Sequence, residues 1–310
     1  MKVFICGITG SQGSALARLL LPSTPVVGLT RNPSSASAAA LTSLGAELLP
    51  GSYDDASALA SALAGCTALF LNPMPSFTDP AAERRDGLTL LAAAKAAGTV
   101  TRVVYSTALS VDAPEKLPNY DPEAYIAKML SQKRFLEGAV RDSGIPHWTI
   151  LRPGNFMTNY VGEPALTRQK DLVFEGVSAT AFARDTKLPM VDTATIGAFA
   201  RAALLDAGNK FDKQEIGLAD ELLTLDELLA KLGAAAGRTL TARYMDDDEV
   251  EAQKMLNPMV GAQVMMRGLA QFLDVDAVKS WGVPLSSFDK FLEREAALVK
   301  ETYDVKDKTA

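Results

Sequence analysis

Short apolar runs alternate with amphipathic helical patterns through the first half of this 310-residue chain. The apolar runs predict strands over residues 2–6, 25–30, 46–49, 67–71, 102–107 and 147–152. The segments between them predict helices over residues 13–21, 34–44, 55–64, 80–97 and 122–143. Glycines stand where four of these helices should stop, at Gly45, Gly65, Gly98 and Gly144. This alternation indicates an α/β fold, a doubly wound parallel sheet with helices on both faces.

The alternation of apolar runs and helical patterns ends after Pro153, and an irregular stretch follows as far as about Leu188. Beyond it come the short apolar segment 190–192, a helical pattern over 195–207 and a strand pattern over 215–218. These three repeat the pattern of the first half, so we expect them to return to the same sheet.

Helical patterns dominate the rest of the chain. Thr224 and Glu227 have the spacing of a capping box, which predicts a helix start. Further helical patterns lie at about 246–272 and 286–300. The sequence therefore predicts a doubly wound domain at 1–153, rejoined at 189–222, and a smaller, mainly helical domain at 154–310.

The first apolar run leads into a glycine-rich turn. Gly7, Gly10 and Gly13 follow it at three-residue spacing, and a helical pattern opens directly after them. Glycines allow the backbone angles of such a turn, and the lack of a Cβ lets a pyrophosphate reach the helix N-terminus. The free N–H groups of that terminus then bind the phosphates. In this strand-turn-helix context the motif predicts a dinucleotide site.

Arg31 indicates which dinucleotide is bound. An NAD site usually places an acid about 20 residues after the glycines, but no Asp or Glu occurs between Met1 and Ala46. The second predicted strand instead delivers Arg31, followed by Asn32 and two serines. A guanidinium offers forked donors to phosphate oxygens, so we predict NADP(H). The alternative is that Arg31 is a solvated residue that closes the strand.

Composition narrows the class of protein. The net charge is -6 and no long run of Lys and Arg occurs, so we do not expect direct nucleic-acid binding. No stretch of about 18 apolar residues occurs, so we expect no membrane span. The N-terminus has no signal-peptide pattern. We therefore expect a cytoplasmic protein whose hydrophobic content, 48%, can bury a large core.

Few residues are available for metal or nucleophilic chemistry. Cys6 and Cys66 end apolar runs of the predicted sheet, so we expect buried thiols and no disulfide. The single histidine, His147, heads a predicted strand, and no Cys or His stands at metal-ligand spacing. We expect no metal site, and a catalytic role for His147 is a minor alternative because no nucleophile elbow accompanies it.

Four segments together resemble the NmrA-like family of atypical short-chain dehydrogenases and reductases. They are the turn at 7–13, the Leu-Thr-Arg at 29–31, Lys133-x-x-x-Glu137, and the Gly-Ile-Pro-x-x-Thr-Ile-Leu-Arg-Pro-x-x-Phe segment at 144–156. The resemblance covers roughly residues 1–230. It implies a Rossmann-type domain that binds NADP, with the glycine turn on the pyrophosphate, Arg31 near the 2′-phosphate and the loop 51–54 against adenine.

The resemblance and the expected strand ends imply a set of binding residues. We expect the cofactor to contact Gly7, Thr9, Gly10, Ser11, Gln12, Gly13, Arg31, Ser52, Tyr53, Asn72, Pro73, Lys133, Pro153, Asn155 and Phe156. Met157 and Tyr160 would line the substrate pocket beside the nicotinamide. Relatives often carry Asp where Ser52 stands, so an adenine contact through that side chain departs from the family pattern.

The usual catalytic pair of the larger family is absent. Ordinary short-chain dehydrogenases place a Tyr four residues before the Lys, and here that position holds Met129. Lys133 is then either a ribose-binding lysine able to donate a proton or a solvated residue on its helix. Tyr125 lies about 12 Å of helical rise before Lys133, so it reaches the substrate only if the helix starts later than predicted.

Two further sets of residues have open alternatives. Ser106 and Thr107 end the fifth predicted strand, so either hydroxyl orients a substrate carbonyl or caps its own strand end. A run of methionines and aliphatic residues continues at helical spacing near the C-terminus: Met255, Leu256, Met259, Val260, Val264, Met265, Met266, Leu269 and Phe272. This run is either core packing or an adaptable pocket over the nicotinamide.

Two functions follow from these observations. The first is an NADPH-dependent oxidoreductase that reduces a carbonyl, imine or activated alkene of a small, largely apolar molecule, with Lys133, Thr107 or water as the proton source. The second is an NADP(H)-sensing regulator without turnover that acts through a protein partner, a hypothesis motivated by Met129. The apolar residues after Pro153 favour the reductase, because a sensor needs no substrate pocket.

Overall fold

The computed structural model describes residues 1–76, 78–254 and 256–305 of the chain. Its contacts divide the chain into two units. The first unit comprises Met1–Val111, Met129–Arg152 and Thr193–Ile216. The second comprises Asp112–Lys128, Pro153–Asp192 and the chain from Gly217 onward.

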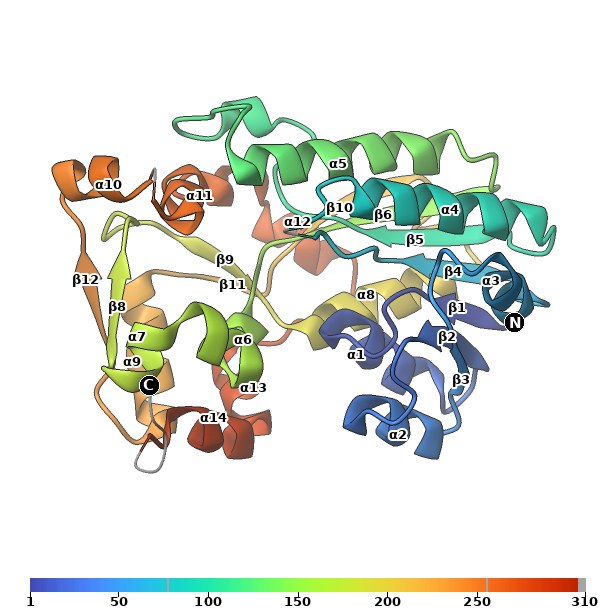
Figure 1. Cartoon of the computed structure of the whole chain (residues 1–310), viewed down its shortest axis with the longest axis horizontal. Coiled ribbons are helices and arrows are strands. Elements are labelled where there is room, and N and C mark those ends of the chain that lie inside the picture. Colours follow the sequence, from blue (N-terminus) through green and yellow to red (C-terminus); the bar gives the residue numbers. More distant parts are fainter. Residues whose placement is uncertain (77, 255, 306–310) are drawn as a thin grey trace. The chain divides into compact units, whose positions relative to one another are not determined.

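A seven-stranded parallel sheet forms the centre of the first unit (Figure 1). Its strands are β1 (Val3–Ile5), β2 (Val26–Thr30), β3 (Glu47–Pro50), β4 (Ala68–Leu71), β5 (Arg102–Ser106), β6 (His147–Pro153) and β10 (Gln214–Leu218). Their order across the sheet is β10-β6-β5-β4-β1-β2-β3. The chain runs outward from β1 to β3 and then returns to β4 on the other side of β1, so the topological switch point lies between β1 and β4. This arrangement confirms the predicted Rossmann-type fold.

Helices cover both faces of this sheet. They are α1 (Ser11–Leu20), α2 (Ala36–Ser43), α3 (Ala56–Leu63), α4 (Ala82–Ala96), α5 (Tyr125–Arg141) and α8 (Thr193–Leu204). Apolar side chains of α3, α4 and α5 share one core cluster with alternate residues of the strands. On the opposite face α1 packs against α8, where a Cβ on Gly197 would lie only 3.0 Å from the backbone nitrogen of Leu16. The helix starts differ from the predicted ones by one to three residues; α1 begins at Ser11, two residues early, and α5 at Tyr125, three residues late.

The two cysteines are buried free thiols, as predicted. Within the residues that the structure describes, none of the helices has the length and apolar character needed to cross a membrane.

The second unit contains two small sheets. One has the order β11-β9-β7, formed by β7 (Asn155–Phe156), β9 (Leu188–Val191) and β11 (Glu221–Leu223). The other pairs β8 (Val177–Thr180) with β12 (Thr241–Tyr244) in parallel. The expectation that segment 190–192 joins the large sheet is therefore wrong, whereas β10 does join it. All four residues of β9 are buried, as in a strand of the large sheet, so burial alone could not identify the partner strand.

Helices make up most of the remaining second unit. They are η1 (Pro114–Lys116), η2 (Met157–Tyr160), α6 (Gly162–Arg168), α7 (Lys170–Phe174), α9 (Leu225–Ala236), α10 (Asp247–Lys254), α11 (Pro258–Met266), η3 (Leu269–Phe272), α12 (Val275–Ser280), α13 (Phe288–Arg294) and α14 (Ala296–Tyr303). The capping box is confirmed, since the Glu227 amide donates to the Thr224 hydroxyl at 3.2 Å and the Thr224 amide to the Glu227 carboxylate at 2.7 Å. The pattern at 246–272 is broken because Asn257 caps a new helix that starts at Pro258.

The backbone packs closely around Gly154, at the start of the second unit. An added Cβ there would lie 2.3 Å from the Pro189 carbonyl oxygen. We therefore expect Gly154→Ala to lower the free energy of unfolding by about 1–3 kcal/mol through overpacking. Gly138 in α5 has open space around its Cβ position, so the control Gly138→Ala should raise it by about 0.5–1 kcal/mol. Urea unfolding measures both, and wild-type stability of Gly154→Ala would contradict the close contact.

Candidate functional site

The turn between β1 and α1 leaves the start of the helix open to a ligand. Gly7 has a φ of +65°, which glycine adopts without strain. A Cβ at Gly13 would lie 2.2 Å from the Gly7 carbonyl oxygen, so only glycine allows α1 to pack this closely on the turn. Gly10 is the N-cap, and in the described part of the chain no side chain caps α1 and no acid lies in its first turn. The first-turn N–H groups of α1, from Ser11 to Gly13, are therefore available to an anion.

Side-chain hydrogen bonds tie this turn to Tyr53, Asn72 and Ser106. The Gly7 amide donates to the Tyr53 hydroxyl at 2.8 Å. The Gln12 side chain donates to Asn72 Oδ1 at 3.4 Å and accepts from the Ser106 hydroxyl at 2.6 Å. Gln12, Asn72 and Ser106 are all buried. The turn is thus tied to the loop after β3 and to the ends of β4 and β5, at the topological switch point.

Burial sets the protonation of the groups behind the turn. It raises the pKa of the Tyr53 phenol well above its usual value, although the bond from the Gly7 amide opposes the shift. It also raises the pKa of the Cys6 thiol to about 11, against the effect of Tyr53. Both groups stay neutral near pH 7, so they support the turn and carry no charge toward a ligand.

Arg31 follows the carboxyl end of β2 and is exposed. Its guanidinium donates no hydrogen bond to any residue that the structure describes. Hydroxyl groups order the loop beyond it, because Ser34 donates to Asn32 Oδ1 at 2.8 Å and Ser37 donates to the Thr9 carbonyl at 2.9 Å. The second bond links the Arg31 loop to the glycine turn. Phosphate binding by Arg31 stays a prediction that its free guanidinium fits.

The loop 51–54, predicted to contact adenine, contains its own hydrogen bond. The Ser52 hydroxyl donates to the Asp54 carboxylate, and this bond lowers the pKa of Asp54. The Ser52 hydroxyl is therefore engaged in its own loop. Pro73, which follows Asn72 at the end of β4, is buried. Contacts of Ser52 and Pro73 with a cofactor stay predictions.

Lys133 is buried and forms an ion pair with Glu83. The Lys133 ammonium donates to Glu83 Oε1, from α5 to α4. Only 8% of Lys133 and 1% of Glu83 is exposed, so Lys133 is not the solvated residue of the alternative interpretation. Burial raises the pKa of Glu83, while the Lys133 charge opposes the shift.

Thr107 belongs to a second buried charge cluster. Its hydroxyl donates to Glu137 Oε1 at 3.0 Å. Arg152 donates to both oxygens of Glu137, at 3.0 and 2.7 Å, and Arg141 donates to Glu137 Oε2 at 2.9 Å. Both arginines also contact Glu215. The cluster joins β5, β6, β10 and α5, and a contact of Thr107 with a substrate stays a prediction.

Tyr125 is the first residue of α5. Since the helix is continuous as far as Arg141, Lys133 lies about 12 Å of rise further along it. Tyr125 therefore does not stand in for the tyrosine that Met129 replaces. Its contact with a substrate stays a prediction.

The residues that follow β6 are described within the second unit. Pro153 is buried, and Phe156 is partly exposed in β7. Asn155 donates to the Tyr160 hydroxyl at 3.4 Å, and burial raises the pKa of that phenol. Met157 and Tyr160 lie in the core of this unit. The structure gives both a packing role, and their contact with a substrate stays a prediction.

The methionine-rich run is partly core. Val260, Val264 and Met265 are buried, the first two in a small cluster with Ala181. Leu256 and Met259 are 79% and 50% exposed. Core packing therefore explains the buried positions only. Met255 lies outside the described residues.

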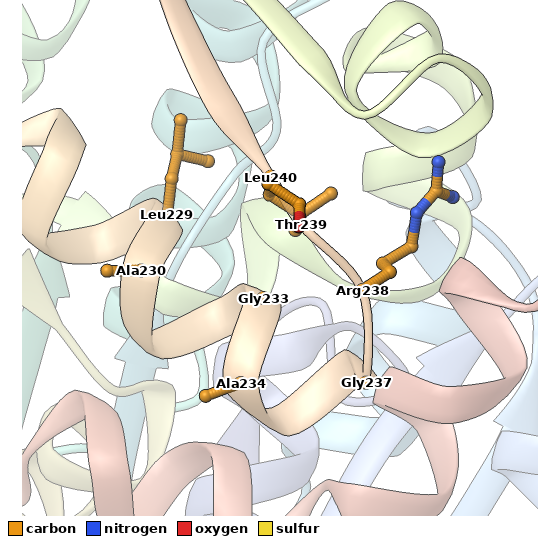
Figure 2. Close-up of a pocket in the computed structure, with 8 residues that line it drawn as sticks. All are labelled: Leu229, Ala230, Gly233, Ala234, Gly237, Arg238, Thr239 and Leu240. Atoms are coloured by element: carbon orange, nitrogen blue, oxygen red, sulfur yellow. The ribbon is translucent and has the colours of Figure 1, made fainter.

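A surface hollow in the second unit lies between α9 and the segment that leads into β12 (Figure 2). It is lined by Leu229, Ala230, Gly233, Ala234, Gly237, Arg238, Thr239 and Leu240. Arg238 is the single charged residue among these eight. Its guanidinium donates to the backbone carbonyls of Val173 at 2.6 Å and Tyr303 at 3.3 Å, which hold the side chain in place.

Sequence reasoning missed Glu83 altogether. An acid in the first turn of a helix is common because it complements the helix dipole, so no local signal marked this residue. Glu137 and Arg152 were visible within the family motifs, but nothing in their spacing showed that they pair. The bond between Tyr53 and Gly7 was likewise hidden.

The fold and the open turn define a Rossmann-type dinucleotide-binding protein. The chain belongs to the NmrA-like family, because the model of that family matches residues 1–296. This match confirms the resemblance found in the sequence and extends it over nearly the whole chain.

Similar proteins include named oxidoreductases and a regulator. A (4-alkanoyl-5-oxo-2,5-dihydrofuran-3-yl)methyl phosphate reductase of Streptomyces griseus subsp. griseus is 32% identical over 253 residues, 82% of this chain and 80% of that protein. The crystal structure of an Escherichia coli NADPH-dependent quinone oxidoreductase complexed with NADPH is 25% identical, with a TM-score of 0.70 over 95% of this chain and 99% of that one. NmrA, a negative transcriptional regulator crystallised with NADP, is 17% identical, with a TM-score of 0.66 over 99% and 96%, a likeness of fold alone.

Substitution of Glu137 tests whether the second charge cluster stabilises the fold. Glu137→Gln would leave two arginines beside a neutral amide in a buried site. We expect it to lower the free energy of unfolding by about 1–3 kcal/mol, because Arg152 loses a carboxylate bound through both oxygens and is left with Glu215 as its charged partner. Glu293→Gln, at an exposed position of α13, should change it by less than about 0.5 kcal/mol. Urea unfolding compares the two, and equal stabilities would argue against the cluster.

Proposed function

We propose that this protein is an NADPH-dependent reductase that acts on a carbon–carbon double bond conjugated with a carbonyl in a small, largely apolar molecule. The observation that carries the proposal is the buried Lys133 ammonium, in the same unit as the open turn before α1. In our proposal this unit supplies both the cofactor site and the proton donor. These are the two contributions that a protein makes to a reduction by hydride transfer.

The cofactor in this proposal is NADP(H). The N–H groups of Ser11 to Gly13 bind the pyrophosphate, since α1 has no capping side chain of its own in the described chain. Arg31 binds the 2′-phosphate with its unused guanidinium donors. Asn72 and Tyr53 hold the turn in place around the bound dinucleotide. The NADPH and NADP complexes of the similar structures support this assignment.

When bound, NADPH supplies a hydride, which carries two electrons to the acceptor. A proton must then complete the reduction, and Lys133 is the donor in our proposal. An N–H bond of Lys133 breaks as the proton passes to the acceptor, and the neutral amine takes a new proton from water. Thr107 already donates its hydroxyl to Glu137, so we assign it a supporting role.

The acceptor class follows from chemistry and from the named relatives. The Streptomyces reductase is named for the methyl phosphate of a 5-oxo-2,5-dihydrofuran with an alkanoyl group, and the double bond of that ring is conjugated with carbonyls. The Escherichia coli enzyme is named for quinones, which have the same conjugation. A conjugated carbonyl spreads the charge that develops after hydride addition, and a nearby ammonium stabilises that charge. We therefore favour an activated alkene over a simple carbonyl or imine.

The alternative function is an NADP(H)-sensing regulator that acts through a protein partner. Its support is Met129, in place of the usual tyrosine, and the fold shared with NmrA. It predicts NADPH binding without oxidation by any conjugated acceptor. Turnover therefore distinguishes the two functions.

Cofactor selectivity is the first test. We expect Arg31→Ala to weaken NADPH binding about 10- to 100-fold and to leave NADH binding unchanged, because only NADPH loses a charge-assisted phosphate contact. Calorimetric titration of both cofactors measures this. Arg18→Ala, which removes another exposed arginine from the same unit, is the matched control. Equal losses for NADPH and NADH in Arg31→Ala would count against the 2′-phosphate contact.

Turnover is the second test. The protein should oxidise NADPH in the presence of an alkanoyl-dihydrofuranone or a quinone, followed by absorbance. Lys133→Met should lower kcat about 100-fold or more, since general acid catalysis contributes about 10²–10⁴. The control Lys128→Met removes an exposed lysine of the same helix that pairs only at the surface with Glu123. Binding of NADPH without turnover of any such acceptor would favour the regulator.

A further inference from the structure

The Glu83 carboxylate pairs with a single described residue, Lys133. Glu83 lies in the first turn of α4, and its Oε1 accepts from the Lys133 ammonium of α5. Its other oxygen, Oε2, is buried and has no hydrogen-bond partner in the described chain. The Tyr105 hydroxyl on β5 is also buried without a partner. Burial and the charges of Glu83 and Glu137 raise the pKa of Tyr105, so this phenol stays neutral beside the pair.

Stability alone does not account for this pair. Removing two charges from water costs free energy, which attraction repays only where the remaining polar atoms are satisfied. Glu137 meets that condition through Thr107 and two arginines, whereas Glu83 does not. Apolar residues at 83 and 133 would avoid the cost of burial. The pair is therefore better explained by what Glu83 does to Lys133.

We propose that Glu83 is the positioning residue for the proton donor: it holds the Lys133 ammonium in place and keeps it protonated until the acceptor takes the proton. This inference rests on the proposed function. In the step, an N–H bond of Lys133 breaks and a C–H or O–H bond forms on the acceptor. The amine then regains a proton from water, while the Glu83 carboxylate is unchanged.

The first experiment needs neither cofactor nor substrate. Glu83→Gln removes the charge and keeps the size of the side chain. Lysines of the intact protein are labelled with limiting acetic anhydride from neutral to alkaline pH, and the reactivity of Lys133 is measured by peptide mass spectrometry against exposed Lys290. Because only a neutral amine reacts, we expect Lys133 in Glu83→Gln to react about tenfold faster near neutral pH than in the wild type.

Glu83→Asp and Glu47→Gln are the controls for labelling. Glu83→Asp keeps the charge and should stay closer to the wild type, whereas general unfolding would expose Lys133 in both Glu83 variants. Glu47→Gln removes a carboxylate from the exposed pair with Lys2 and should leave Lys133 unchanged. Equal Lys133 reactivity in Glu83→Gln and the wild type would overturn the inference.

The second experiment is a double-mutant cycle on turnover. We expect Glu83→Gln to lower kcat about 10- to 100-fold, with less than about a threefold change in the Kd for NADPH, and to move the alkaline limb of the pH–rate profile to lower pH. In the Lys133→Met background it should have no further effect, because Glu83 acts through Lys133. Effects that multiply would overturn the inference. If no acceptor is turned over, the proposed function fails while the labelling result still decides the role of Glu83.

Discussion

The close packing of α1 on the Gly7 carbonyl is the constraint on which the candidate site depends. Gly13 permits it, since a Cβ there would lie 2.2 Å from that oxygen. Because α1 packs so closely on the turn, its first-turn N–H groups lie just beyond the strand ends. The same packing places the Gln12 side chain within hydrogen-bond distance of both Asn72 and Ser106. A larger residue at position 13 would move α1 outward. It would disturb the anion site and the links between β4 and β5 together, because one backbone contact supports both.

Features that depend on neighbouring residues could be predicted from the sequence. The strands of the first half are short buried runs between helices, and the glycine turn and Arg31 are local motifs, so their place in the fold followed from pattern alone. Segment 190–192 was assigned to the wrong sheet, because the burial of a strand does not identify the strand that it pairs with. A continuous helical pattern was expected over 246–272 because the apolar spacing continues past Asn257. In the structure the Asn257 side chain instead caps the start of a separate helix, α11.

Contacts between distant residues could not be predicted. Glu83 and Lys133 are 50 positions apart, and Tyr53 and Gly7 are 46 apart. Only the packing of α4 beside α5, and of the loop after β3 against the turn, brings these groups together. The Lys133-x-x-x-Glu137 spacing was visible, but it shows only that both residues follow one side of a helix, and not that each has a different partner.

The two charge clusters on α5 differ in how completely the protein satisfies them. Glu137 accepts from a hydroxyl and two guanidinium groups, none of which releases a proton near pH 7, so its cluster is fixed in charge as well as in position. Glu83 accepts from an ammonium, which can lose a proton and regain it. Lys133, the partner of Glu83, and Glu137 lie about one helical turn apart on α5, so the bonds of Glu137 restrain the part of the helix that carries Lys133. In our proposal Glu83 therefore holds Lys133 in position and protonated, while the ammonium can still pass a proton to an acceptor.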